Sequence, residues 1–384
     1  MRLASCLFLA FLAPSAAPVL RAQTFIVDQH NGAGTHFTSL ATAIAAVPDG
    51  AVLIVRAGFY LESFVIQGKG LTVLGEPGAL VSLPFQGGEA RITGLAAHQS
   101  VCVRDLTIGV NNNNPTPRSL SCAASQGLIV IENTPATPTL LNLDVRDCAQ
   151  VVVRDCNLRT TLAVENVHLE RSNVVFERCL LGSGLIAMTQ LDGAVQLIDT
   201  AVTGGTLFLG PVPHAIATYQ GALRVLGNST VIGGQNLSAG PGYAITGTSA
   251  VRLDPSVILG GANPPLDPAL PVVVAPMPRA LTAYLVPSQI RAELLGPTGQ
   301  LGVLLCGAPG APTPVPGCLD SFWLAGSPLF LVAAGTLSPL VPLVHTLPMS
   351  GSPALLGVRL GWQGASYDPA TGFALSNPSF QVVR

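Results

Sequence analysis

A run of apolar residues followed by two charged residues and a cysteine, Val151–Leu158, returns in altered form 23 residues later as Val174–Leu181 (174 − 151 = 23). Side chains of a strand alternate between its two faces, so Val151 and Val153 point to one side and Arg154 to the other. Looser copies of the run begin at residues 101, 195, 223 and 251. The apolar side needs a partner in every copy, so the chain is predicted to stack its copies on one another.

The spacing of the copies predicts the fold class. One slot of the repeat holds Cys179, Thr200 and Ser229, which lie 21 and 29 residues apart (200 − 179; 229 − 200). A repeat of about 20–50 residues marks stacked units that cannot bury their apolar face alone. Units this short have no room for a helix in each repeat. We therefore predict an all-β chain, a parallel β-helix with three short strands and three turns in each of roughly nine coils.

Glycine pairs follow successive copies of the repeat. They are Gly204-Gly205, Gly233-Gly234 and Gly260-Gly261. Glycine adopts positive φ without a steric penalty, so these pairs are predicted to form the tight corners of the coils.

The segment before the coils predicts one short helix. Leu40, Ala43, Ile44 and Val47 recur at helical spacing, and Thr38 is the predicted N-cap. An uncovered apolar end of a solenoid has free strand edges that invite aggregation. The predicted role of this helix is to cap the first coil.

Residues 25–78 resemble a known family. The matching stretches are Ile26–Asp28, Gly32–Leu40, Ala43-Ile44, Pro48–Gly50, Ile54-Val55 and Gly58–Glu62. In this order they are similar to the opening of pectin methylesterases and of the wider pectin-lyase-like superfamily of right-handed parallel β-helix proteins. The resemblance implies a right-handed parallel β-helix.

The catalytic motifs of that superfamily are missing from the sequence. Pectin methylesterases carry Gln-Ala-Val-Ala-Leu, Gln-Asp-Thr-Leu, Asp-Phe-Ile-Phe-Gly and Leu-Gly-Arg-Pro-Trp runs, and this chain has none of them. Its nearest fragments are Gln196–Thr200 and Leu360–Trp362. The Asp-Asp, Gly-His-Gly and Arg-Ile-Lys elements of polygalacturonases are also missing.

Charge and composition narrow the range of partners. Charged residues make up 10% of the 384, against about 25% in an average globular domain, and the formal net charge is −2. The only lysine is Lys69, so neither nucleic acid nor an anionic membrane is an expected partner. No cofactor or metal site is expected.

The N-terminus predicts export. Met1-Arg2, the apolar run Leu3–Leu12 and small residues up to Ala22 have the order of a secretory signal, so residues 1–22 are predicted to be removed. The predicted location is therefore secreted or at the cell surface. An oxidising location permits disulfides, and Cys306 and Cys318, which flank a Pro/Gly-rich loop, are the favoured pair.

The remaining cysteines are Cys102, Cys122, Cys148, Cys156 and Cys179. Cys156 and Cys179 occupy the same slot of neighbouring coils. That slot is predicted to pack small side chains, and a disulfide between the two is the alternative.

Charged pairs along the coils are the candidate chemistry. Stacking the two best copies places Arg154 over Glu177 and Asp155 over Arg178, about 4.8 Å apart, which predicts solvated surface ladders. His168 and Glu170 share one strand face, with Glu165 across a turn. A histidine between carboxylates can act as a general base, or the group can be a solvated polar face, which we favour.

Proline and apolar strands mark a second region. A solenoid over residues 23–261 is followed by a predicted stiff linker at 262–278 and a β-sandwich at 279–384, with short apolar strands between turns. Residues 321–358 carry no formal charge, but prolines divide them into pieces too short for a membrane-spanning helix.

Gly361–Pro369 and Ala374–Pro378 are similar to a C-terminal β-domain of many secreted bacterial proteins, which implies sorting, attachment or display. The Asn111–Pro117 stretch is predicted to be an exposed loop.

Three functions are compatible with these features. The favoured one is a non-catalytic scaffold or polysaccharide-binding surface, with cell-surface glycan as the expected partner. The second is a lyase, esterase or hydrolase acting on polysaccharide. Its candidate groups are Asp105, Asp147, Asp155, Glu165, His168, Glu170 and Glu177, with His168, Glu170 and Asp155 as the catalytic candidates. The third is an adhesive protein that binds a protein partner. The oligomeric state is left open by the sequence.

Overall fold

The computed structural model describes residues 23–84, 88–110, 118–134, 141–159, 165–207, 210–285, 289–316, 318, 320–349, 358–370 and 372–383. The predicted signal segment 1–22 and the predicted loop Asn111–Pro117 lie outside these residues. The described chain is all-β apart from the helix α2 (Leu40–Ala46). It contains no helix with the length and apolar character needed to cross a bilayer.

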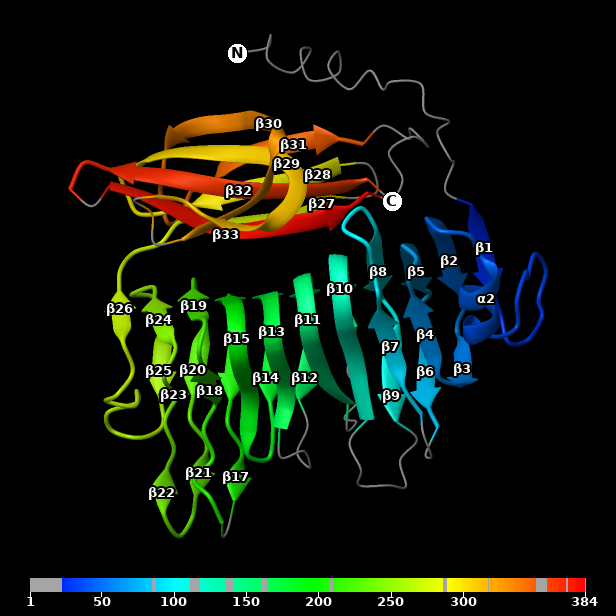
Figure 1. Cartoon of the computed structure of the whole chain (residues 1–384), viewed down its shortest axis with the longest axis horizontal. Helices are drawn as coiled ribbons and strands as arrows, with labels where there is room; N and C mark the ends of the chain where they lie inside the picture. Colours follow the sequence, from blue (N-terminus) through cyan, green and yellow to red (C-terminus); the bar gives the residue numbers. More distant parts are fainter. Residues whose placement is uncertain are drawn as a thin grey trace.

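A parallel β-solenoid forms the first part of the chain (Figure 1). Its largest sheet stacks β1 (Thr24–Val27), β2 (Ala51–Val55), β5 (Leu71–Gly75), β8 (Ser100–Arg104), β10 (Arg118–Glu132), β11 (Leu141–Arg154), β13 (Glu165–Glu177), β15 (Ile186–Ile198), β19 (Ala222–Leu226), β24 (Ala250–Leu253) and β26 (Val272–Val274). Four shorter strands extend the same sheet: β4 (Phe64–Gln67), β7 (Ala90–Thr93), β18 (Ile216–Tyr219) and β23 (Ile245–Gly247).

Most of the described coils also contribute a strand to another face. One sheet there holds β3 (Gly58–Leu61), β6 (Ala79–Leu83) and β9 (Thr107–Val110), and a second holds β12 (Asn157–Arg159), β14 (Leu180–Gly182), β16 (Ala201–Thr203), β20 (Thr230–Ile232) and β25 (Ile258–Gly260). A small sheet of β17 (Thr206–Leu207), β21 (Gln235–Asn236) and β22 (Gly240–Pro241) extends from the later coils. The described part of the solenoid has about 8 turns, slightly fewer than the nine coils predicted, and the predicted parallel repeat architecture is confirmed.

The four longest solenoid strands bend in the middle. β10, β11, β13 and β15 contain residues with positive φ at Ala124, Asp147, Arg171 and Asp192. Each strand therefore has two halves that face different directions. We call the face formed by the first halves with β7 and β18 the open face. The face formed by the second halves with β8 and β19 is called the docked face.

A second ladder of positive-φ residues follows the docked face. Asp105, Asn133, Asp155, Arg178 and Asp199 have φ of 54°, 47°, 52°, 52° and 50°. The amide of each donates to a carbonyl of the next coil, as Asp155 N does to Glu177 O at 2.9 Å. Asn and Asp tolerate this conformation better than most residues. The corners therefore depend mainly on these polar residues.

The glycine pairs have a different role from the predicted one. Of the six residues, only Gly261 has positive φ, at 118°. Gly204, Gly205, Gly233 and Gly234 lie where neighbouring coils touch: a Cβ on Gly205 would be 2.2 Å from the carbonyl oxygen of Gly184. These four glycines are needed for close backbone approach between coils, and the prediction of positive-φ corners was wrong for every member of the pairs except Gly261.

The interior of the solenoid is one continuous apolar core. Val151, Val153 and Phe176 are among its fully buried side chains, together with Cys156 and Cys179. The shared slot of Cys179 and Thr200 is buried, and Thr200 Oγ1 accepts a hydrogen bond from Cys179 N at 3.2 Å. Small side chains therefore fill this slot and satisfy backbone groups of the corner, as predicted.

Helix α2 packs its apolar face on the same core. Leu40, Ala43 and Ile44 are buried as predicted. The N-cap is Ser39 instead of the predicted Thr38, because the Ser39 hydroxyl accepts a hydrogen bond from Thr42 N at 3.2 Å. Glu62 accepts hydrogen bonds from the first amides of the helix, at 2.8 Å from Leu40 N and 3.1 Å from Ala41 N.

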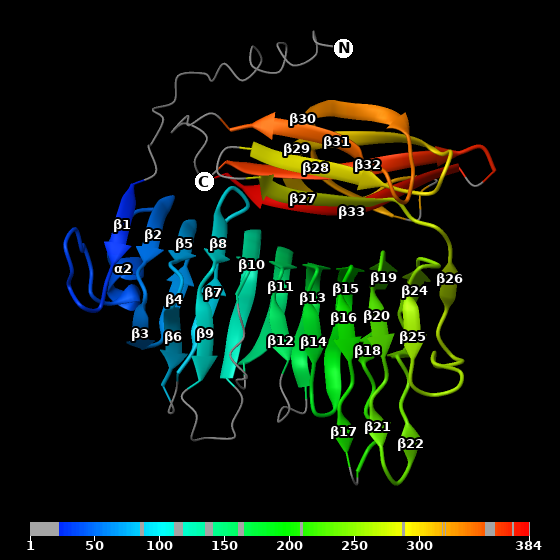
Figure 2. The same cartoon turned by 180° about the vertical axis from the view of Figure 1, so that it is seen from behind.

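The segment predicted as a linker carries the last strand of the solenoid. Within residues 262–278, β26 pairs in parallel with β24, and Val272 lies beside Val251. The solenoid therefore continues beyond Gly261, and the chain passes from β26 directly to the C-terminal unit (Figure 2).

The C-terminal unit consists of two antiparallel sheets. One contains β27 (Arg279–Leu285), β28 (Gln289–Leu295) and β31 (Leu343–Pro348). The other contains β30 (Ser321–Thr336), β29 (Leu301–Pro314), β32 (Arg359–Asp368) and β33 (Gly372–Val382). Ile290 and Leu294 of the first sheet share a buried cluster with Leu304 and Trp362 of the second.

The C-terminal unit lies along the solenoid, over the docked face (Figure 1). Val152 and Val175, which alternate with the interior valines, belong to a second apolar cluster with Trp323 and Phe380 of the C-terminal unit. Both faces of the repeated strand are therefore buried. The outward valines would expose a long apolar row to water without this partner.

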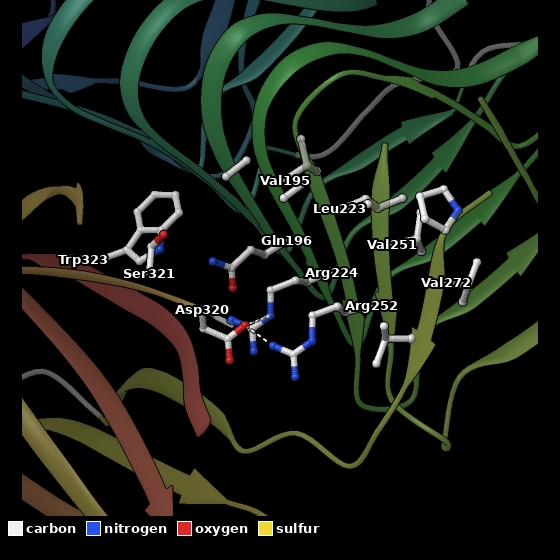
Figure 3. Close-up of a pocket in the computed structure, with 15 residues that line it drawn as sticks. Val195, Gln196, Leu223, Arg224, Val251, Arg252, Val272, Asp320, Ser321 and Trp323 are labelled. Carbon is white, nitrogen blue, oxygen red and sulfur yellow. Dashed lines mark hydrogen bonds and ion pairs between the residues drawn. The ribbon is translucent and has the colours of Figure 1, made fainter. Parts of the chain in front are cut away.

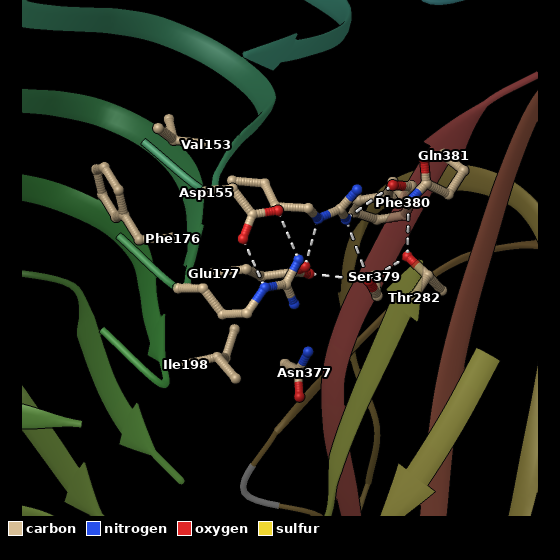
Figure 4. A network of polar contacts seen from close by, with 12 residues as sticks. Val153, Asp155, Phe176, Glu177, Ile198, Thr282, Asn377, Ser379, Phe380 and Gln381 are labelled. Atoms are coloured by element: carbon tan, nitrogen blue, oxygen red, sulfur yellow. Dashed lines mark hydrogen bonds and ion pairs between the residues drawn. The ribbon is translucent and has the colours of Figure 1, made fainter. Parts of the chain in front are cut away.

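Charged groups beside this row form a buried network (Figure 4). Arg154 Nε donates to Glu177 Oε2 at 2.6 Å, and the side chains are 1% and 0% exposed. Ser379 donates to Glu177 at 2.9 Å, and Arg154 Nη2 donates to the Phe380 carbonyl at 3.0 Å. The predicted solvated ladder was wrong for this pair, because β33 covers it. The neighbouring pair of Asp155 and Arg178 is exposed, as predicted.

Glu177→Gln is predicted to destabilise the fold strongly, because it leaves the buried Arg154 without its counter-charge. Removal of one partner of a buried pair costs about 3–5 kcal/mol. Asp155→Asn, which breaks the exposed pair of the same two coils, is the matched control and should cost at most about 1 kcal/mol. Chemical unfolding gives both free energies. Equal losses for the two variants would contradict the buried network.

Candidate functional site

The open face carries the candidate groups that the structure brings together. We call Asp144 and Arg146 of β11, with Glu165, His168 and Glu170 of β13, the polar strip. Asp144 lies beside His168 and Arg146 beside Glu170 in the strand register. All five side chains are partly exposed. The predicted grouping of Glu165, His168 and Glu170 is therefore present, although Glu165 lies on β13 itself and not across a turn as predicted.

The charges of the polar strip compensate one another. His168 Nδ1 lies 3.1 Å from Glu165 Oε1, and His168 Nε2 lies 4.0 Å from Glu170 Oε2. Arg146 Nε donates to Asp144 Oδ1 at 2.8 Å, which raises the pKa of Arg146. Arg146 also lies 3.9 Å from Glu170. The result is a surface rich in both donors and acceptors, with each carboxylate beside a cation or the imidazole.

Polar positions continue the strip along the solenoid. Ser121 of β10 lies beside Asp144, and Thr189 of β15 lies beside His168. Both side chains are partly exposed. Four successive strands, each about 4.8 Å from the next, thus present a polar group in one row. Such a row suits an extended ligand that lies along the solenoid.

The remaining candidates lie elsewhere. Asp105 and Asp155 are in the corner ladder beyond the docked face, where Arg178 holds the Asp155 carboxylate at 2.7 Å. Asp147 lies in the bend of β11 and pairs with Arg171 at 2.6 Å. Glu177 is buried under β33. Of the three catalytic candidates, His168 and Glu170 are neighbours, and Asp155 belongs to a different row.

A cleft between the solenoid and the C-terminal unit is the site that sequence reasoning missed (Figure 3). Its polar lining includes Gln196, Arg224, Arg252 and Asp320. A signal was present in the sequence, because Arg224 and Arg252 hold the same position of consecutive copies. Like charges on neighbouring strands repel, so two stacked arginines indicate that an anionic group lies nearby and neutralises them. Asp320 comes from a distant part of the chain and has no repeat to mark it.

The seven cysteines of the described residues, from Cys102 to Cys318, are free thiols. Cys306 is buried in the core of the C-terminal unit, and Cys318 is only partly buried, so the predicted Cys306–Cys318 disulfide is not formed. Burial raises the pKa of Cys102 and of Cys306 to about 12. In the described part of the chain, no group of three or more His, Cys, Asp or Glu residues is placed to hold a metal ion.

Comparison with known proteins adds no relative. No protein-family model matches the chain, and no curated protein is similar to it in sequence. The resemblance of residues 25–78 to pectin-lyase-like proteins therefore stays a prediction, and the site must be interpreted from its own geometry.

Thiol counting tests the arrangement of the cysteines. In native residues 23–384, we expect one thiol to react quickly with a chromogenic disulfide reagent, because Cys318 is the only one of the seven that is not buried. Burial keeps the reagent from the other six thiols and slows their reaction. After denaturation without reductant, all seven should react. A total of five reactive thiols after denaturation, with none reactive in the native protein, would instead demonstrate the Cys306–Cys318 disulfide.

Proposed function

We propose that the protein is an exported, non-catalytic scaffold that binds polysaccharide through the polar strip. The observation that carries this proposal is the row of paired charged and polar side chains across the open face. A sugar chain presents hydroxyl groups that both donate and accept hydrogen bonds. Paired carboxylates and guanidinium groups on an accessible surface can satisfy both kinds.

The architecture proposed for this scaffold is a right-handed, pectin-lyase-like parallel β-helix. The order of matching stretches over residues 25–78 supports the superfamily, and the packing of α2 on the interior core supports a role as cap of the first coil. In this proposal the two C-terminal sheets form a β-sandwich that serves attachment or sorting.

The proposed location is outside the cell or on its surface. The signal-like order of residues 1–22 supports removal of this segment after Ala22, which would leave Gln23 as the first residue. The low charge of the chain and the absence of a lysine cluster fit a glycan partner better than nucleic acid.

A polysaccharide-active enzyme is the second candidate. It is favoured by one observation, the 3.1 Å contact between His168 and Glu165, since a carboxylate that orients a histidine can support a general base. Against it, Arg146 lies beside Asp144 and Glu170, so these carboxylates have a counter-charge close by. The sequence also lacks the catalytic motifs of the superfamily it resembles.

Binding to a panel of acidic and neutral polysaccharides tests the proposal. Arg146→Ala should weaken binding by about tenfold or more, because hydrogen bonds to charged groups are among the stronger ones. Arg178→Ala removes a partly exposed arginine of the corner ladder and should leave binding unchanged.

Two outcomes would overturn the scaffold proposal. Cleavage or de-esterification of a polysaccharide at an enzymatic rate, lost in His168→Ala, would establish the enzyme. Absence of binding to every glycan tested would favour an adhesive protein that recognises a protein partner.

A further inference from the structure

The cleft between the solenoid and the C-terminal unit has the size of a ligand site. Its volume is about 360 Å³, within the range of about 300–1,000 Å³ of small-molecule pockets. The floor comes from β15, β19, β24 and β26, and Asp320, Ser321 and Trp323 of the C-terminal unit line the opposite side (Figure 3).

A row of alanines opens this space. Ala194, Ala222 and Ala250 lie side by side on the outward face of three consecutive coils. In an earlier coil Gln150 stands on the same outward face and donates to the Gly310 carbonyl of the C-terminal unit. Where the glutamine bridges the two parts of the molecule, the alanines leave a gap.

The cleft has an excess of positive charge. Arg224 and Arg252 are register neighbours, and both meet the single carboxylate of Asp320. The three side chains are 8%, 15% and 1% exposed. Burial lowers the pKa of Arg224 to about 10, although Asp320 opposes this, so the guanidinium remains charged at neutral pH. Two cations and one anion leave one uncompensated positive charge.

Several buried polar atoms of the cleft lack a hydrogen-bond partner. They are Arg224 Nε, Arg252 Nε, Asp320 Oδ2 and Gln196 Oε1. Two are donors and two are acceptors. Buried polar atoms are normally satisfied by protein, water or a ligand. A ligand that fits must therefore offer acceptor and donor groups together.

We propose that this cleft binds a small hydroxycarboxylate. The carboxylate supplies the missing negative charge and accepts from the arginines. A neutral hydroxyl donates to Asp320 or Gln196. An amino acid would bring a positively charged ammonium group together with its carboxylate, so the excess positive charge of the cleft would remain. It therefore fits less well. Pro271, Val273 and Trp323 provide apolar surface for the carbon chain. The ligand is either a free hydroxy acid or an acidic sugar unit of a polymer.

Three six-carbon compounds test separately whether the carboxylate and the hydroxyl groups of the ligand are required for binding. Calorimetric titration of residues 23–384 should detect gluconate, which has both groups. Hexanoate lacks the hydroxyls and glucose lacks the carboxylate, so each should bind at least about tenfold more weakly. A polyuronate that binds where gluconate does not would assign the polymeric source, provided that the cleft variants abolish the binding.

Two variants alter the cleft by different means. Arg252→Gln leaves Arg224 and Asp320 as a balanced pair, so the fold should persist while gluconate affinity falls at least about tenfold. Ala222→Leu keeps every charge and fills the gap. Arg178→Gln removes an arginine outside the cleft and should leave the affinity for gluconate unchanged. Thermal unfolding checks that each variant is folded.

The proposal is overturned if neither gluconate nor the polyuronate binds the unaltered protein. It is also overturned if binding persists in both Arg252→Gln and Ala222→Leu. The cleft variants leave the polar strip intact, so loss of gluconate binding with retained polysaccharide binding distinguishes this site from the one on the open face.

Discussion

The burial of the docked face is the interaction on which the rest of the structure depends. Val152, Val175 and their register neighbours form an apolar row on the outside of the solenoid, and Trp323 and Phe380 cover it. Burial of such a row stabilises the fold in proportion to the apolar area removed from water. It also fixes which polar groups are buried, which face stays open and where a cleft remains.

Covering the docked face separates the charged residues into two classes. Arg154 and Glu177 are enclosed with Ser379, where hydrogen bonds to each other and to the C-terminal unit offset part of the cost of burying the two charges. The polar strip stays in contact with water and can exchange it for a ligand. The C-terminal unit is thus packed against the solenoid over the docked face, whereas the sequence had predicted a separable module.

The repeat could be predicted because its cause is local. Apolar residues return at a fixed spacing, and Val151 and Val153 face the interior as period-two alternation requires. The role of the outward Val152 could not be inferred in the same way, because its partner Phe380 lies more than 200 residues later. The same separation explains the wrong exposure of Arg154, whose partner Ser379 lies 225 residues later. The cleft was missed because Asp320 lies 68 residues after Arg252, outside the repeat. His168 and Glu170 were placed correctly because both lie on one strand.

Unfolding followed by two probes tests the central claim most directly. Both tryptophans, Trp323 and Trp362, belong to the C-terminal unit, so fluorescence reports on that unit, whereas far-UV circular dichroism reports on the strands of the whole chain. If the docked face joins the two parts into one cooperative body, the two transitions will coincide. A fluorescence transition that is complete while most of the dichroism remains would contradict it.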